Sequence, residues 1–356
     1  MATTEIDSIL KSQVDNNKSP SVQYVIFDTD RVIHKFEYGF AKIGDHIPTA
    51  YNTTYGGFSI TKTVTALAIL QLAEKGKLNI DDVASNYLYD FPYSSNITIR
   101  QVLSHTAGIP NPLPLRWVHL PEESESFDRN SFFKQIFIKN GKTKSGPNEK
   151  FAYSNIGYIL LGQIIEEVSG LRYEDYIYKN ILEPIDITKG ELDFVINDTD
   201  LHATGYQKSF SLMNLILGFM MDKSKFMGGT EGKWKLFKDM YVNGAPHGGL
   251  IGTPIGFMKY IQELLKKENR LSLDNNMQML FTENLTNSNK KTGMCLSWFK
   301  GKLNGHEYFT HAGGGGGYYC EIRIYPSTSI GSVIMFNRTG VKDERFLDKV
   351  DKFVIK

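Results

Sequence analysis

A serine and a lysine stand three residues apart at the start of an apolar stretch, GGFSITKTVTALAILQL (56–72). In a helix, residues three apart share one face with their Cβ atoms about 5–6 Å apart, so Lys62 can reach Ser59 Oγ. A serine becomes a nucleophile when a neighbouring base takes its proton. Burial of an apolar helix would lower the pKa of Lys62 and suit the amine to that role. The alternative is that Ser59 caps the helix and Lys62 extends to solvent.

The spacing Ser-x-x-Lys carries little information by itself, because it recurs elsewhere in the chain. The other copies have amphipathic, loop-like or strand-like surroundings, and they are Ser8/Lys11, Ser131/Lys134, Ser288/Lys291 and Ser297/Lys300. Only the copy at Ser59 follows two glycines and enters an apolar helix. The helix N-terminus would add a positive dipole and unpaired N–H groups beside this serine.

A second motif, Tyr153-Ser154-Asn155, directly precedes a helical pattern in FAYSNIGYILLGQIIEEVSG. Side chains at such a loop-to-helix junction can project into a cleft. A tyrosine beside an ammonium group is driven toward phenolate and can serve as a general base. The alternative is that Tyr153 packs as an ordinary aromatic residue while Ser154 caps the helix.

A third motif, His311-Ala312-Gly313, ends a strand-like segment and is followed by Gly314 and three more glycines. Glycines let a substrate approach the backbone closely. A free N–H group there could pair with one from the Ser59 helix to form an oxyanion hole. The alternative is a flexible hairpin turn that contains an incidental histidine. The similar stretch His247-Gly248-Gly249 has no strand leading into it.

The flanking sequence predicts an antiparallel sheet built from both ends of the chain. Residues 22–40 place β-branched and aromatic runs on either side of the turn at 28–30, which predicts a hairpin. Closely spaced strands with short turns pair antiparallel. Further strand-like segments of this kind lie at 293–300, 306–313, 318–326 and 329–337. A helix is expected over 341–355.

The middle of the chain is predicted to be helical, with apolar residues at helical spacing in 154–170 and 253–267. We therefore expect an α+β fold, in which a mostly helical lobe is inserted into a sheet flanked by helices. The sheet lobe would comprise 1–56 and 245–356 and the helical lobe 57–244, with the active site at their interface. The segment 207–247 begins apolar and methionine-rich. It is interpreted as a core helix, or alternatively as a lid or acyl-pocket wall.

The bulk composition excludes several classes of protein. Lysine plus arginine number 40 against 39 acidic residues, which leaves no basic field for nucleic acid. Cys295 and Cys320 are too few for a disulfide framework or a cysteine-rich metal site, so two free buried thiols are expected, or alternatively one bridge.

The apolar runs are too short or interrupted for the roughly 20 residues of a membrane span. The N-terminal residues lack the apolar core of a secretory signal, so we expect a cytoplasmic protein unless an export signal has been removed.

The three motifs occur in the order Ser-x-x-Lys, Tyr-x-Asn, His-x-Gly. In this combination the sequence resembles the serine β-lactamase and penicillin-binding-protein superfamily, specifically its class C β-lactamase-like branch of esterases, D-aminopeptidases and DD-carboxypeptidases. The resemblance covers most of the chain from about 20 to about 340. It extends through GGFSITKTVTALAILQLAEKGKLNIDD, ITIRQVLSHTAGIP, FAYSNIGYILLGQIIEEVSG, GGLIGTP and HAGGGGGYYCEIRIYP. It implies a β-lactamase/transpeptidase-like fold.

The resemblance also implies a role for each residue of the first two motifs. Ser59 would be the acylated nucleophile, and Lys62 and Tyr153 would transfer protons, with Tyr153 as the favoured base. Asn155 would hydrogen-bond the substrate or hold Lys62 in place. No metal and no organic cofactor are implied.

The third motif departs from the β-lactamase pattern, in which Lys-Thr-Gly engages the substrate carboxylate. His311 and Gly313 would line the substrate site, and the backbone N–H groups of Ser59 and Gly314 would form the oxyanion hole. A histidine that is mostly neutral at pH 7 is a weaker anchor for a carboxylate, so efficient β-lactam hydrolysis is not expected. The absence of export would also argue against peptidoglycan as the substrate.

We predict a serine hydrolase that acts on a small ester or a short peptide, with carboxylesterase activity as the leading interpretation. One alternative is a D-aminopeptidase, a DD-carboxypeptidase or a weak β-lactamase of the same fold. The other is a catalytically silent binding or scaffold protein, because a fold alone does not secure a function. The acyl-chain preference and the oligomeric state stay open.

Overall fold

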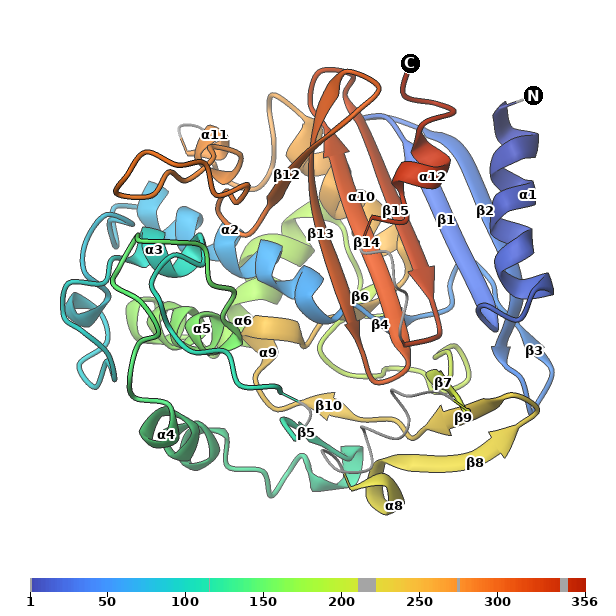
Figure 1. The fold of residues 1–356 in the computed structure, drawn as a ribbon, viewed down its shortest axis with the longest axis horizontal. Helices are drawn as coiled ribbons and strands as arrows, with labels where there is room; N and C mark the ends of the chain where they lie inside the picture. The colour runs from blue at the N-terminus through green and yellow to red at the C-terminus, as the bar shows by residue number, and fades with distance from the viewer. Residues whose placement is uncertain (1, 115, 211–221, 274–275, 340–344) are drawn as a thin grey trace.

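A seven-stranded sheet forms one side of the molecule (Figure 1). The computed structural model describes residues 2–114, 116–210, 222–273, 276–339 and 345–356. All neighbouring strands of the sheet pair antiparallel. In spatial order they are β12 (Phe299–Leu303), β13 (His306–Gly315), β14 (Tyr318–Tyr325), β15 (Ile330–Phe336), β1 (Ser21–Phe27), β2 (Val32–Lys42) and β3 (Ile47–Pro48). Both ends of the chain meet in one sheet, which confirms the predicted α+β class.

Helices cover both faces of this sheet. α1 (Ala2–Asp15) and α12 (Asp348–Asp351) lie on one face, and α10 (Pro254–Leu265) packs on β1 and β15 on the other. Every residue of β1 is buried, since alternate side chains enter the cores on its two faces. Burial on both faces explains why apolar residues do not strictly alternate with polar ones along the β1 sequence SVQYVIF.

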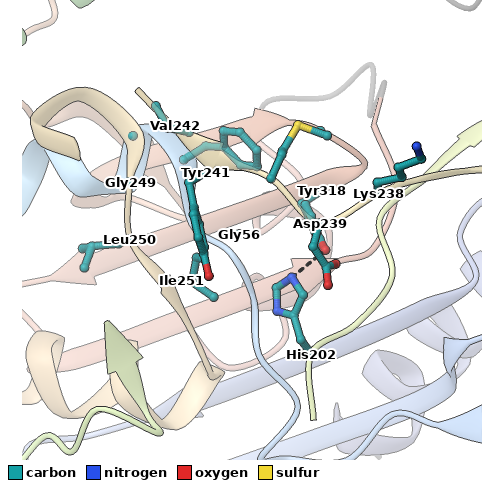
Figure 2. A pocket seen from close by; sticks show the side chains of 14 residues that line it. Gly56, His202, Lys238, Asp239, Tyr241, Val242, Gly249, Leu250, Ile251 and Tyr318 are labelled. Carbon is teal, nitrogen blue, oxygen red and sulfur yellow. Dashed lines mark hydrogen bonds between the residues drawn. The ribbon is translucent and has the colours of Figure 1, made fainter. Parts of the chain in front are cut away.

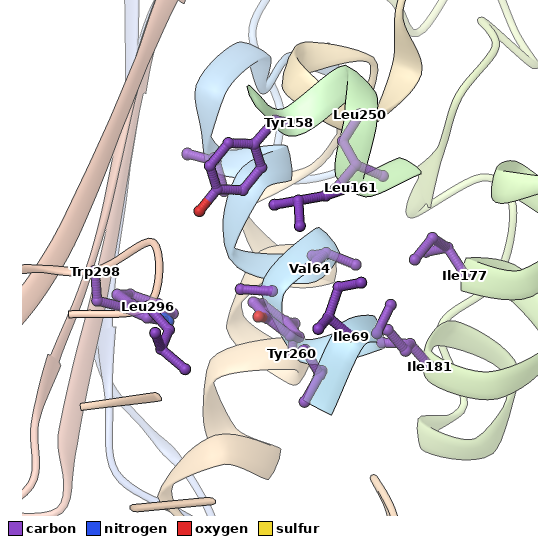
Figure 3. Close-up of a cluster of buried hydrophobic side chains, with 14 of the residues drawn as sticks. Val64, Ile69, Tyr158, Leu161, Ile177, Ile181, Leu250, Tyr260, Leu296 and Trp298 are labelled. Atoms are coloured by element: carbon purple, nitrogen blue, oxygen red, sulfur yellow. The ribbon is translucent and has the colours of Figure 1, made fainter. Parts of the chain in front are cut away.

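The helix α2 (Thr61–Glu74) runs through the centre of the molecule, and each residue from Thr61 to Leu72 is buried. Figure 3 shows its Val64 and Ile69 among side chains from α5 (Asn155–Ser169), α10 and the loop at Leu296. A helix that is apolar on all sides is stable only inside a core. Lys62 is therefore carried into the interior by the helix to which it belongs.

Shorter elements complete the described part of the chain. The helices are α3 (Ile99–Leu103), α4 (Arg129–Lys139), α6 (Tyr173–Ile177), α8 (Lys223–Phe226), α9 (Ala245–Gly248) and α11 (Met277–Leu280). The short strands are β4 (Tyr55–Gly56), β5 (Val118–His119), β6 (Leu192–Asp193), β7 (Tyr206–Lys208), β8 (Met227–Glu231), β9 (Trp234–Phe237), β10 (Tyr241–Val242) and β11 (Ile251–Gly252).

Two predicted elements differ from the structure. The strand expected over 293–300 begins only at Phe299, because Gly293 and Ser297 have φ of 70° and 72° and bend the chain into a buried loop. The helix expected over 341–355 is reduced to α12, and 340–344 lie outside the described residues. Beyond α12, the Asn304 amide donates to the carbonyls of Lys352 and Ile355. That contact holds the end of the chain in a non-helical conformation.

The segment 207–247 is also different from its prediction. Its described part forms strands β7 to β10, the short helix α8 and the start of α9. A turn at Gly232, whose φ is 59°, joins β8 and β9. The apolar residues at 211–221 were the reason for predicting a core helix, or alternatively a lid. These residues lie outside the described residues.

Several other predictions can be compared with the described residues. Cys295 and Cys320 are both free and buried, as expected. No helix among the described residues is long and apolar enough to cross a membrane. The division into lobes 1–56 with 245–356 and 57–244 stays a prediction.

Candidate active site

Ser59 lies in a short 3-10 turn, Phe58–Ile60, between β4 and α2. No side chain caps this turn or α2, and the residue at the N-cap of α2 is Ile60. Ser59 Oγ instead lies 3.0 Å from Lys62 Nζ and 3.0 Å from the Tyr153 hydroxyl. The capping alternative for Ser59 is therefore wrong, and the structure brings together the serine, the lysine and the tyrosine that the sequence had singled out.

Lys62 is completely buried, which excludes the solvent-directed alternative. Its Nζ donates to Ser59 Oγ and, at 2.5 Å, to the carbonyl oxygen of His247. The amine also lies over the rings of Tyr153 and Tyr158, 5.0 Å and 5.6 Å from their centroids. Burial lowers the pKa of Lys62 well below its usual range. The lowered pKa makes it easier for this amine to exchange a proton with its neighbours.

Tyr153 is positioned by two neighbours. Ser154 caps α5 by accepting from the Gly157 amide, and this fixes the start of the helix directly after the tyrosine. The ring of His105 packs on the Tyr153 ring with 4.3 Å between the centroids. The Ser154 amide donates to Nδ1 of His105 at 3.1 Å. The His105 ring therefore fixes the Tyr153 ring, and the Tyr153 hydroxyl lies against Ser59 Oγ.

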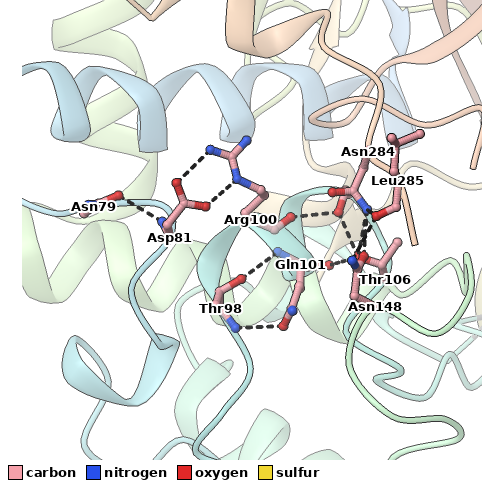
Figure 4. A network of polar contacts seen from close by, with 10 residues as sticks. Asn79, Asp81, Thr98, Arg100, Gln101, Thr106, Asn148, Asn284 and Leu285 are labelled. Atoms are coloured by element: carbon pink, nitrogen blue, oxygen red, sulfur yellow. Dashed lines mark hydrogen bonds and ion pairs between the residues drawn. The ribbon is translucent and has the colours of Figure 1, made fainter. Parts of the chain in front are cut away.

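The loop that carries His105 is itself anchored by polar contacts (Figure 4). Thr98 and Gln101 form a capping box at the start of α3, just before this loop. The amide of Asn284 donates to Thr106 and Asn148, which ties a third segment to the loop. The backbone amide of Asn148 also donates to the Thr106 carbonyl. This network keeps the His105 loop beside the segment that leads to Tyr153.

Asn155 is the first residue of α5 and is buried. Its side-chain amide donates to Asn111 Oδ1 at 3.1 Å, and its backbone amide donates to the same oxygen at 3.0 Å. Within the described residues, Asn155 has no hydrogen bond to Lys62. Its predicted contact with the substrate stays a prediction.

His311 lies in β13, on the sheet side of the site, and only 1% of it is exposed. Its Nδ1 is 2.8 Å from the Ala312 carbonyl, which can only accept, so Nδ1 carries the proton. Nε2 then presents a lone pair, and it is buried without a hydrogen-bond partner among the described residues. Burial, and then the charge of Lys62, lower the pKa of His311 to about 3. The ring is therefore a neutral acceptor at pH 7.

Gly313 and Gly314 continue β13 past the turn that holds Ser59. A methyl group added at Gly313 would overlap the Gly57 carbonyl and lie 3.0 Å from the Ser59 amide nitrogen. Only glycine allows so close an approach of the two backbones. At Gly314 the nearest atom to an added methyl group is 3.6 Å away. Its predicted role depends on its N–H group rather than on the missing side chain.

Acid should destabilise the fold through its buried histidines. The pKa of His311 is about 3 in the folded state, below its ordinary value of 6.5, so the unfolded chain binds the proton first and stability falls as pH drops from 6.5 toward 3. The slope is about 1.4 kcal/mol per pH unit for each such histidine. We expect His311→Gln to flatten the dependence of the unfolding free energy on pH by about that amount, measured by urea unfolding at pH 7, 6 and 5. The matched control is His46→Gln at an exposed position, and equal slopes in wild type and His311→Gln would contradict the prediction.

Sequence reasoning missed several residues that shape the site. His247 contributes its backbone carbonyl to Lys62, a contact that no side-chain pattern could signal. His105 supports Tyr153, although no motif of the sequence marks it. Phe58 has φ of 44°, an unusual conformation for a bulky residue, directly before Ser59. Across the described ranges, no cluster of three or more histidine, cysteine or acidic residues could hold a metal ion.

Comparison with known proteins gives a family profile and several relatives. The profile described as Beta-lactamase matches residues 6–354. "Protein flp" of Staphylococcus aureus (strain N315) is 30% identical over 210 residues, which cover 57% of this chain and 41% of that protein. "Penicillin-binding protein 4*" of Bacillus subtilis (strain 168) is 35% identical over 156 residues, 43% of this chain and 34% of that protein. The matched region thus spans less than half the length of these relatives.

Solved structures share the fold at lower sequence identity. The octameric penicillin-binding protein homologue from Pyrococcus abyssi has a TM-score of 0.80 and 22% identity, covering 100% of this chain and 77% of that chain. A class C β-lactamase has a TM-score of 0.76 and 18% identity, covering 99% and 95% of the two chains. At such identities these structures are similar to this chain in fold.

Proposed function

The chain belongs to the β-lactamase family, and from this premise we propose that it is a serine hydrolase that cleaves carboxylic esters through an acyl-enzyme on Ser59. The observation that carries the proposal is the position of Ser59 Oγ, 3.0 Å from both Lys62 Nζ and the Tyr153 hydroxyl. A serine hydroxyl needs a base within this distance to attack a carbonyl.

The proposed reaction has two steps. Tyr153 acts as the base in its phenolate form, after its own proton has passed to the Lys62 amine. Ser59 Oγ then bonds to the ester carbonyl carbon, and the serine proton passes to the Tyr153 oxygen. The bond to the alcohol oxygen then breaks, and the alcohol leaves with the proton. In the second step water, deprotonated by the same groups, attacks the acyl-enzyme and releases the acid and free Ser59.

The developing negative charge on the carbonyl oxygen needs donors. We assign these to the backbone N–H groups of Ser59 and Gly314. The close approach of β13 to the Ser59 turn at Gly313 supports this assignment, because it places both backbone segments beside the nucleophile.

His311 supports an ester rather than a β-lactam as the substrate. A buried neutral ring with a free lone pair cannot form the ion pair that a substrate carboxylate requires. Asn155 is proposed to contact the substrate. The second candidate is a peptidase of the same fold, which the similarity to penicillin-binding proteins favours.

A panel of substrates distinguishes these activities. We expect kcat/KM for p-nitrophenyl butanoate to exceed that for nitrocefin by more than about tenfold, because the β-lactam carboxylate meets a neutral acceptor. D-Amino-acid amides test the peptidase. Turnover of the amides alone would make the second candidate the function, and preferential turnover of nitrocefin would contradict the reading of His311.

A further inference from the structure

A small cavity lies beside the segment that leads into Ser59 (Figure 2). The space in which the centre of a water-sized group can lie is about 30 Å³. On the same measure, one water molecule needs about 10–15 Å³. Its walls are mostly apolar or aromatic and include Phe58, Met240, Tyr241, Leu250 and Tyr318. The cavity therefore suits a small group at the end of an otherwise apolar chain.

The cavity shares its wall with the proposed reaction centre. Phe58 is bonded directly to Ser59, and its ring lines the cavity. Gly248 also lines it and follows His247, whose carbonyl holds Lys62. A methyl group at Gly248 would touch the backbone of Phe58, at 3.5–3.7 Å. The cavity and the nucleophile are therefore formed by adjacent residues of the same turn.

Asp239 places a carboxylate in this cavity. Within the described residues, its side chain has no hydrogen bond and no ion pair. The cation that affects it most is Lys42, whose amine donates to the Thr199 carbonyl instead. Lys238 also lines the cavity, but its amine points away from the carboxylate in Figure 2. Burial raises the pKa of Asp239, as expected for a carboxylate that lacks a counter-ion.

Two other polar side chains of the cavity, Tyr318 and His202, are already paired. The Tyr318 hydroxyl donates to the Ala203 carbonyl at 2.5 Å, so its oxygen accepts from Nε2 of His202 at 2.9 Å. Nδ1 of His202 then accepts from Thr54. Burial, and then the charge of Lys42, lower the pKa of His202 to about 4, so it adds no positive charge at pH 7. Among the residues that line the cavity, Asp239 is the carboxylate, and within the described residues no cation forms an ion pair with it.

We propose that this cavity binds a primary ammonium group of the substrate, with Asp239 as its counter-ion and the aromatic walls packed around its methylene groups. An ammonium group is close to water in size and pairs with a carboxylate through charge-assisted hydrogen bonds. The rings of Phe58, Tyr241 and Tyr318 favour a cation further through their π faces. The lone pair of His311 Nε2, which can only accept, likewise selects a substrate that donates hydrogen bonds. The inference depends on the proposed function, since it names the substrate class of the same site.

Matched pairs of esters test the proposal. p-Nitrophenyl β-alaninate is compared with p-nitrophenyl butanoate, and p-nitrophenyl 6-aminohexanoate with p-nitrophenyl heptanoate; in each pair an ammonium group replaces a methyl group. We expect the ammonium ester of at least one pair to have a kcat/KM about tenfold higher at pH 7. In Asp239→Asn this preference should disappear, while kcat/KM for the neutral esters stays within about twofold.

The matched control is Asp90→Asn, which removes one negative charge at an exposed position and should keep the preference. No preference in the wild-type enzyme, or a preference that survives in Asp239→Asn, would overturn the ammonium site. Failure of the proposed function is a different result, since the neutral esters would then not be hydrolysed at all. Loss of neutral-ester turnover in Asp239→Asn would show that Asp239 supports the fold or the chemistry instead, and would also overturn the proposal.

Discussion

Ser59→Ala is expected to lower kcat/KM for p-nitrophenyl butanoate by about 10⁴-fold or more and to abolish covalent labelling by a fluorophosphonate. Loss of a nucleophile that acts together with its proton carriers costs nearly all of the catalysis that the group provides. Only the hydroxyl oxygen is removed, and it lies between Lys62 and Tyr153 without capping a helix. The fold should therefore be retained. Intact-mass spectrometry after labelling measures the adduct, and circular dichroism checks the fold.

Ser131→Ala is the matched control for this experiment. Ser131 has the same Ser-x-x-Lys spacing with Lys134, but it lies on α4, where its hydroxyl donates to Asp128. Labelling should be unchanged in this variant. An adduct that persists in Ser59→Ala would remove the nucleophile assignment. Absence of an adduct in the wild-type protein would favour the catalytically silent binding or scaffold alternative.

The central residues of the site could be predicted because their sequence surroundings define their structural positions. Lys62 lies on a helix that is apolar on all sides, so its burial followed from the pattern. Tyr153 directly precedes a helix with a recognisable serine cap, which identified the junction. In both cases, local sequence was enough to indicate where the side chain lies. Helix spacing also predicted that Lys62 reaches Ser59. That Tyr153 joins this pair within hydrogen-bonding distance was expected only from the resemblance to a family.

Other parts could not be predicted, since they depend on contacts between distant segments. His105 reaches Tyr153 because its loop, with φ of 55° at His105, is fixed by residues near 148 and 284. The apolar residues before Phe299 have a composition typical of a strand, yet they form a loop that is buried in the core. Asp239 belongs to no sequence motif that could have indicated a role. Its significance arises from the cavity that β10, β11 and the Ser59 turn form around it.

Tyr153→Phe is expected to lower the rate of Ser59 acylation by about 10²- to 10⁴-fold, the usual contribution of general acid–base catalysis. The substitution removes the hydroxyl that lies 3.0 Å from Ser59 Oγ and keeps the ring. The packing of that ring on His105 and under the Lys62 amine should therefore be retained. The acylation rate is measured as the rate of adduct formation with the fluorophosphonate, with thermal unfolding as the check on the fold.

The comparison variant is Tyr158→Phe, which removes the hydroxyl of the other tyrosine beneath Lys62. That hydroxyl donates to the Leu103 carbonyl and not to Ser59, so we expect its loss to affect stability, by about 1 kcal/mol, more than acylation. An unchanged acylation rate in Tyr153→Phe would transfer the base role to Lys62 alone. That outcome is chemically reasonable, because burial already lowers the pKa of the Lys62 amine. A large loss in Tyr153→Phe with little loss in Tyr158→Phe would instead assign the base to the hydroxyl that contacts the nucleophile.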